Sequence, residues 1–198
     1  MRKSFPTRDA QPRDRLPRST PRLTLRRLSS ADLRQFQSYR GDPNVGRYQG
    51  WSAMDDAAAA AFLDAMANAA MGVAGEWFQM AIADRLTDAL VGDIGVCVGA
   101  VDPATAEIDF TIAPAAQARG LGTEAVSAAL ALLFETGTID RVAGITDIRN
   151  TPSIRLLERV GMRLLRKRDA VCKGETCREH VYEIARPDSA PTAQTRAL

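Results

Sequence analysis

The segment that most constrains the fold is residues 106–125, AEIDFTIAPAAQARGLGTEA. Its first seven residues alternate polar and apolar side chains, which predicts a half-buried strand that Pro114 ends. Residues 120–136 are apolar almost all round, which is typical of a buried helix. Only a short glycine-containing turn separates the two elements. The chain must therefore place the first N–H groups of a helix close to the end of a strand.

That turn has the composition of a phosphate-binding turn. The first N–H groups of a helix have no partner within the helix, and the helix dipole adds positive potential there. Gly120 and Gly122 carry no Cβ atom that would hold an anion away. A P-loop is excluded because Thr-Glu follows instead of Lys-Ser/Thr, and the dinucleotide fingerprint is weak because Ala125 replaces its last glycine. We predict that the turn binds a phosphate group.

The remaining patterns predict a mixed sheet with flanking helices. Alternating or apolar runs indicate strands at 22–28, 77–83, 90–101, 141–146, 162–172 and 178–185. Helical patterns cover 29–40, 55–70 and 151–160, with Ser29 and Thr151 expected as caps. Antiparallel strands come early and a βαβ unit comes late. The fold class is therefore α+β, with a mostly antiparallel sheet of about seven strands.

The ends of the chain differ from its middle. Residues 1–20 hold six basic and two acidic residues among several prolines, and we expect a disordered basic arm. Contact with a polyanion and a targeting peptide are the alternatives for this arm. Residues 187–198 are expected to be a loose tail, so that residues 21–186 form the folded domain.

Composition bounds the cellular context. No apolar run reaches the length of a membrane helix, and no signal-peptide stretch follows Met1. Three cysteines without paired zinc spacing fit a reducing compartment, so Cys172 and Cys177 are expected as free thiols on either side of a hairpin turn. We expect a cytoplasmic protein with no metal site, no membrane and no direct nucleic-acid partner. A homodimer is compatible with the sequence.

Two signatures give the chain a family resemblance. Residues 117–122, QARGLG, resemble the Gln/Arg-x-x-Gly-x-Gly/Ala pyrophosphate signature of the GNAT superfamily of acyl-coenzyme A N-acyltransferases. Residues 150–162, NTPSIRLLERVGM, resemble its second signature. LTLRRLSSAD, LVGDIGV, AEIDFTIAP and GETCREHVYEI are similar to the Rim-type branch, which acetylates N-termini of ribosomal proteins and, in its relatives, small amines. The resemblance spans about residues 22–186 and implies a GNAT fold with splayed middle strands.

The resemblance also implies a site for acetyl-coenzyme A as cosubstrate. In the family, backbone N–H groups of the glycine turn hold the pyrophosphate, the splayed strand end near Ile112 pairs with the pantetheine arm, and Asn150 hydrogen-bonds that arm. The turn residues that correspond are Gln117, Ala118, Arg119, Gly120, Leu121, Gly122 and Thr123.

The reaction also needs a base and an acid. Attack on a thioester needs a neutral amine, and a carboxylate on the polar face of residues 106–112 could accept its proton. Glu107 matches a recurrent family glutamate, Asp109 is the second candidate and Asp93 a weaker third. A solvated or ion-paired carboxylate is the alternative reading for each.

For the acid, many GNAT enzymes use a tyrosine where this chain has Leu157. The Rim-type branch offers Ser153 instead. A serine that only caps the helix start is the other reading of that residue.

The sequence therefore predicts an N-acetyltransferase that moves an acetyl group to a primary amine by direct attack. The acceptor would be a protein N-terminus or a small amine. A catalytically silent acyl-coenzyme A sensor is the alternative function.

Overall fold

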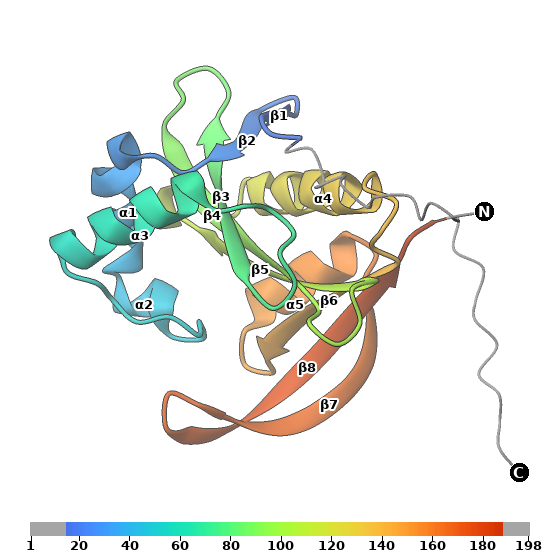
Figure 1. The fold of residues 1–198 in the computed structure, drawn as a ribbon. Coiled ribbons are helices and arrows are strands. Elements are labelled where there is room, and N and C mark those ends of the chain that lie inside the picture. The colour runs from blue at the N-terminus through green and yellow to red at the C-terminus, as the bar shows by residue number, and fades with distance from the viewer. Residues whose placement is uncertain (1–14, 188–198) are drawn as a thin grey trace, which may run out of the picture.

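The computed structural model describes residues 15–187, and these form one eight-stranded sheet flanked by helices (Figure 1). The strand order is β1-β2-β3-β4-β5-β6-β8-β7. Every neighbouring pair is antiparallel except β5 and β6, which are parallel. The strands are β1 (Arg18–Ser19), β2 (Leu23–Arg27), β3 (Trp77–Asp84), β4 (Leu90–Val98), β5 (Thr105–Ile112), β6 (Arg141–Asp147), β7 (Arg163–Cys172) and β8 (Glu175–Ala185). The predicted α+β class is confirmed.

Helices cover both faces of this sheet. They are α1 (Leu33–Arg40), α2 (Pro43–Gly46), α3 (Asp56–Asn68), α4 (Leu121–Phe134) and α5 (Thr151–Arg159). Helices α1 and α3 pack on one face around Phe36, Tyr39 and Leu63. Helices α4 and α5 pack on the other face in a larger apolar cluster, and most of α4 is buried, as its composition predicts. The two faces therefore have separate cores, with the sheet between them.

Short polar residues cap the helices: Ser29 as predicted, Asp55 without a prediction, and Asn150 in place of the predicted Thr151. Ser29 and Asp32 form a capping box before α1, and Asp55 accepts a hydrogen bond from the N–H of Ala58 at the start of α3. At α5, however, the cap is Asn150 rather than Thr151, because the side chain of Asn150 accepts from the N–H of Ser153 at 3.3 Å. Asn150 therefore fixes the start of α5 at the edge of the gap described below.

The predicted boundary of the basic arm at residue 20 is too late. Residues 15–20 lie against the domain, and β1 pairs with β2 through Arg18 opposite Leu25. Arg18 also bonds Glu135 on α4 at 2.6 Å. Strand β1 in this segment is the eighth strand, which the sequence did not predict. It has only two residues, and the prolines and arginines around it are not typical of a strand. Residues 1–14 and 188–198, which hold the rest of the predicted arm and tail, lie outside the described residues.

The β7–β8 hairpin corrects the prediction of free thiols. Cys172 and Cys177 form a disulfide across the turn, with 5.8 Å between their Cα atoms. That spacing lies within the range that a disulfide needs, and it follows from the register of the hairpin. The cysteine argument for a reducing compartment therefore fails. Among residues 15–187, no helix is long and apolar enough to cross a membrane.

Glu124 in the first turn of α4 ties the β1–β2 connection to the helix. One of its carboxylate oxygens accepts from the Thr20 hydroxyl at 2.6 Å and from the N–H of Arg22 at 2.9 Å. Its other oxygen accepts from the Arg22 guanidinium at 2.6 Å. Burial works against ionisation here, but the Thr20 and Arg22 hydrogen bonds lower the pKa of Glu124 below its ordinary value.

We predict that Glu124→Gln lowers the free energy of unfolding by about 1 to 2 kcal/mol at pH 7, because charge-assisted hydrogen bonds to a mostly covered carboxylate are lost. Glu135→Gln is the matched control on the same helix. It breaks more exposed pairs with Arg15 and Arg18, and should cost less than about 1 kcal/mol. Urea unfolding measures both.

Because the lowered pKa stabilises the fold only while Glu124 is ionised, the difference between Glu124→Gln and wild type should vanish as the pH falls through that pKa. If Glu124→Gln and Glu135→Gln lowered the free energy of unfolding equally at pH 7, Glu124 would not be the residue that ties the β1–β2 connection to α4.

Candidate active site

The two parallel strands at the centre of the sheet part halfway along their length. Residues of β5 and β6 pair from Thr105 with Arg141 as far as Ile108 with Gly144, and no pairing follows. Beyond that point two glutamine side chains take the place of β6: Gln49 donates to the carbonyl of Phe110 at 3.3 Å, and Gln117 donates to that of Ile112 at 2.9 Å. A gap therefore opens through the sheet, and its backbone carbonyls bond side chains instead of a strand.

A groove of about 610 Å³ runs from this gap over the start of α4. Part of its wall is the predicted cradle, and its lining includes Ile112, Gln117, Ala118, Gly120, Leu121, Gly122, Thr123, Asn150 and Ser153. The groove thus brings together nearly all of the residues expected to hold a cosubstrate. Arg119 is the exception, since it is absent from the lining and its carbonyl accepts from Arg22 at 2.9 Å.

Gly120 and Gly122, the two glycines of the predicted cradle, are each required at their positions for a different structural reason. Gly120 precedes α4 with φ +75°, a left-handed conformation that side chains rarely adopt. Gly122 is buried in the first turn of α4, and a Cβ there would lie 2.7 Å from the side chain of Leu156 and 3.2 Å from that of Ile112. The space beside Gly122 is therefore filled by protein rather than left open for an anion. At Gly120 the atom within 4 Å of such a Cβ belongs to the Arg22 guanidinium, at 3.5 Å, and the role of Gly120 in anion binding stays a prediction.

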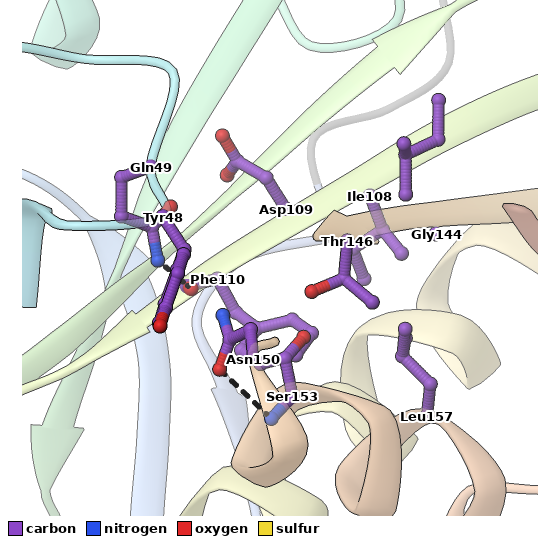
Figure 2. A pocket seen from close by; sticks show the side chains of 11 residues that line it. Tyr48, Gln49, Ile108, Asp109, Phe110, Gly144, Thr146, Asn150, Ser153 and Leu157 are labelled. Carbon is purple, nitrogen blue, oxygen red and sulfur yellow. Dashed lines mark hydrogen bonds between the residues drawn. The ribbon is translucent and has the colours of Figure 1, made fainter. Parts of the chain in front are cut away.

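At the gap itself lies a small cavity that three predicted residues share. Asp109, Asn150 and Ser153 line it together with Tyr48, Thr146 and others (Figure 2). Asp109 belongs to the face of β5 that α1 and α3 cover, whereas Ser153 lies on α5 on the opposite face. Figure 2 shows the carboxylate and the hydroxyl on opposite sides of the cavity. The gap thus has a carboxylate on one side and an alcohol on the other.

Comparison with known proteins decides the family. A family model described as the acetyltransferase (GNAT) domain matches residues 22–163. This chain belongs to the GNAT acetyltransferase family. As a GNAT acetyltransferase, it is an acyl-coenzyme A-dependent enzyme.

Individual relatives agree with this assignment. The chain is 28% identical over 138 residues to the uncharacterized N-acetyltransferase p20 of Bacillus licheniformis, covering 70% of this chain and 77% of p20. Its fold is similar to a GNAT-family acetyltransferase from Bacillus anthracis, with a TM-score of 0.74 and 23% identity over 85% of this chain and 97% of the other. RimL, a ribosomal L7/L12 alpha-N-protein acetyltransferase, gives a TM-score of 0.73 at 12% identity, over 85% and 93% of the two chains. At such identities the two structures support the fold alone.

The two carboxylates predicted for this GNAT acetyltransferase occupy different surroundings. Asp109 lies at the gap, and burial, followed by the charge of Asp93, raises its pKa to about 6. Burial also raises the pKa of Glu107, but this residue lines neither the cavity nor the groove. Asp93 is fully buried and bonded to Arg40 at 2.5 Å. Asp109 is therefore the candidate base that the geometry favours.

Ser153 has a free hydroxyl among the described residues. Its N–H is the group that Asn150 caps, whereas the hydroxyl makes no hydrogen bond to any residue of 15–187. The reading in which the Ser153 side chain caps the helix is therefore wrong. Leu157 is 1% exposed, and its side chain packs where a Cβ on Gly144 would otherwise lie. No proton donor stands at this position.

Several residues of the site were not among the predicted ones. Gln49 and Thr146 line the small cavity, and Arg155 and Arg159 line the groove. The two arginines are four residues apart on α5, a spacing that puts them on one helix face. That spacing is a signal that the sequence offered, whereas nothing local distinguishes Gln49 or Thr146.

Proposed function

We propose that this GNAT acetyltransferase transfers the acetyl group of acetyl-coenzyme A to a primary amine by direct attack. The observation that carries the proposal is the gap between β5 and β6, which joins the groove on the α4–α5 face to a carboxylate on the α1–α3 face. A thioester and an amine could meet there from opposite sides of the sheet. The residues on each side have the chemistry that the transfer needs.

The groove fits the cosubstrate by its chemistry. The N–H groups at the start of α4 supply a site for pyrophosphate, and Arg155 and Arg159 add positive charge to the same groove. The unpaired edge of β5 offers backbone groups to the amides of the pantetheine arm. The side chains of Gln49 and Gln117 now bond the carbonyls of that edge, and they are the groups that such an arm would displace or join.

In the proposed reaction Asp109 accepts one proton from the acceptor ammonium, which leaves a neutral amine. The amine nitrogen forms a bond to the acetyl carbon and then loses its second proton to solvent, and the carbon–sulfur bond breaks as the electron pair leaves with sulfur. Ser153 donates its hydroxyl hydrogen to the departing thiolate and regains a proton from solvent. A carboxylate with a pKa of about 6 is ionised at neutral pH and still basic enough to act.

We further propose that the acceptor is the α-amine of a protein or a small amine, as in the Rim-type branch. RimL, which has a similar fold, is a ribosomal L7/L12 alpha-N-protein acetyltransferase. Protein N-termini are therefore the class of acceptor to test first. The silent acyl-coenzyme A sensor, which the sequence left as the alternative, is not favoured. The chain belongs to an acetyltransferase family, and a sensor needs neither Asp109 nor Ser153 at the gap.

For Asp109→Asn we predict a turnover about 10² to 10⁴ lower with unchanged affinity for acetyl-coenzyme A, because a general base is lost and the groove is untouched. Coenzyme A release is measured against free N-terminal peptides, a polyamine and an aminoglycoside. In wild type, kcat/KM should fall below about pH 6, where Asp109 takes up a proton. Turnover within twofold of wild type would remove Asp109 from the mechanism.

The same variant should stabilise the fold at pH 7.5. Since the raised pKa makes ionised Asp109 unfavourable in the folded state, its removal raises the melting temperature above pH 6. The gain should shrink as the pH falls from 6 towards 4, because the carboxyl of wild type then becomes protonated in the folded state.

For Ser153→Ala we predict unchanged acetyl-coenzyme A affinity, measured by calorimetry, and a turnover lowered by about 10² or more. Thr151→Ala is the matched control, because it removes a hydroxyl from the same helix turn outside the small cavity. Ser153→Ala with turnover within twofold of wild type would mean that the thiolate leaves without this donor.

A further inference from the structure

A row of three residues crosses the centre of the sheet beside the gap. Gln79 on β3 lies opposite Gly95 on β4, and Gly95 lies opposite Asp109 on β5. Gln79 and Asp109 are two strands apart, about 10 Å between backbones, and side chains at such positions normally have a third side chain between them. Here the middle residue is glycine, so the two side chains can meet above it.

The Asp109 carboxylate occupies the space over Gly95. Its Oδ1 accepts from the N–H of Gly95 at 2.8 Å. A Cβ on residue 95 would lie 2.3 Å from that oxygen and 2.6 Å from Oε1 of Gln79. No side chain at position 95 is compatible with the present position of the carboxylate. Gly95 therefore supplies both the space and one hydrogen-bond donor.

Gln79 bonds two carboxylates with one amide group. Its Nε2 donates to Oδ1 of Asp93 at 2.8 Å and lies 3.4 Å from Oδ1 of Asp109. Both hydrogens of the amide are therefore directed to acidic oxygens, and Gln79 itself is buried. Asp93 in turn accepts from Tyr39 at 2.6 Å and pairs with Arg40. Asp93 is thus a fixed charge that holds the Gln79 amide in one orientation.

We infer that Gln79 is a positioning residue for this acetyltransferase, which acts through Asp109 by fixing Oδ1 of its carboxylate over Gly95 and leaving Oδ2 for the acceptor amine. The inference rests on the proposed function of Asp109. Oδ1 has its bonds to Gly95 and Gln79, whereas Oδ2 makes no hydrogen bond to any of residues 15–187. Because Asp109 lines the small cavity at the gap, its Oδ2 is the oxygen that we infer is left for the acceptor amine.

The charged surroundings of Asp109 determine which way its titration should move. Asp93 on β4 and Glu107 on β5 raise its pKa, while Arg40 on α1 and the N–H of Gly95 lower it. Tyr39 on α1 bonds Asp93, and Tyr48 lines the same cavity. A donor such as Gln79 stabilises the ionised form of Asp109. Loss of Gln79 therefore raises the pKa of Asp109 for two reasons. One hydrogen bond to its carboxylate is lost, and the negative charge of Asp93 beside it loses a donor that partly offsets it.

The test uses Gln79→Met, which keeps the length of the side chain and removes both donors. Carbon-13 NMR of the side-chain carboxyls, with Asp109 assigned by Asp109→Asn, should show its pKa higher than in wild type by about half a unit to one unit. This readout needs no acceptor, so it is independent of the proposed function. An unchanged pKa would overturn the inference.

A second arm tests whether Gln79 acts through Asp109. Gln79→Met alone should lower kcat about tenfold without a change in the KM for acetyl-coenzyme A, and move the acidic limb of kcat to higher pH. In the Asp109→Asn background the same change should have no further effect. A similar loss in both backgrounds would show that Gln79 acts elsewhere. Gln79→Leu, which also removes both donors and adds no charge, serves if Gln79→Met fails to fold, and it should raise the pKa of Asp109 as well.

Discussion

The feature on which the rest of the structure depends is the end of the β5–β6 ladder at Ile108 and Gly144. Backbone groups at the centre of a sheet normally pair with the next strand, and leaving them unpaired is unfavourable. Here Gln49 and Gln117 bond the free carbonyls from outside the sheet. The same parting connects a groove on one face with a carboxylate on the other. We propose that the cosubstrate and the acceptor approach one carbon atom from these two sides.

Buried charges lie on the α1–α3 side of the gap, where we propose that the acceptor enters. Arg40 pairs with Asp93 beneath the helices α1 and α3, and its guanidinium also lies over the Trp51 ring at 4.4 Å. Lys173 in the turn of the β7–β8 hairpin bonds the carbonyl of Gly46 at 2.7 Å, at the end of α2. The segment that carries Tyr48 and Gln49 is therefore held at its two ends, by Arg40 of α1 at Trp51 and by Lys173 of the hairpin at Gly46. Removing one member of such a buried pair leaves an uncompensated charge, which makes these contacts sensitive to mutation.

Local patterns in the sequence were enough to predict most elements and the glycine turn at the start of α4. The alternation at residues 106–112, the apolar helix after Gly120 and the box of Ser29 with Asp32 each specify structure within a few residues. The family signatures then indicated Asn150 and Ser153, which the fold brings to the same cavity.

What the sequence could not predict depends on register between distant strands. That Gln79, Gly95 and Asp109 form one row is decided by two ladders, and no residue of the row is unusual for a strand by itself except the glycine. Three further features could not be predicted for the same reason, since each depends on a distant part of the chain or on the register of a turn. They are strand β1, the disulfide of Cys172 with Cys177 and the packing of Leu157 against Gly144.

The central claim is that the parted strands receive the pantetheine arm while the start of α4 holds the pyrophosphate. Amide hydrogen exchange with and without acetyl-coenzyme A tests it most directly. We expect slower exchange at residues 109–112 and 118–122 in the presence of acetyl-coenzyme A, with the amides between β2 and β3 unchanged as an internal reference. Binding that leaves exchange at both segments unaltered would contradict it.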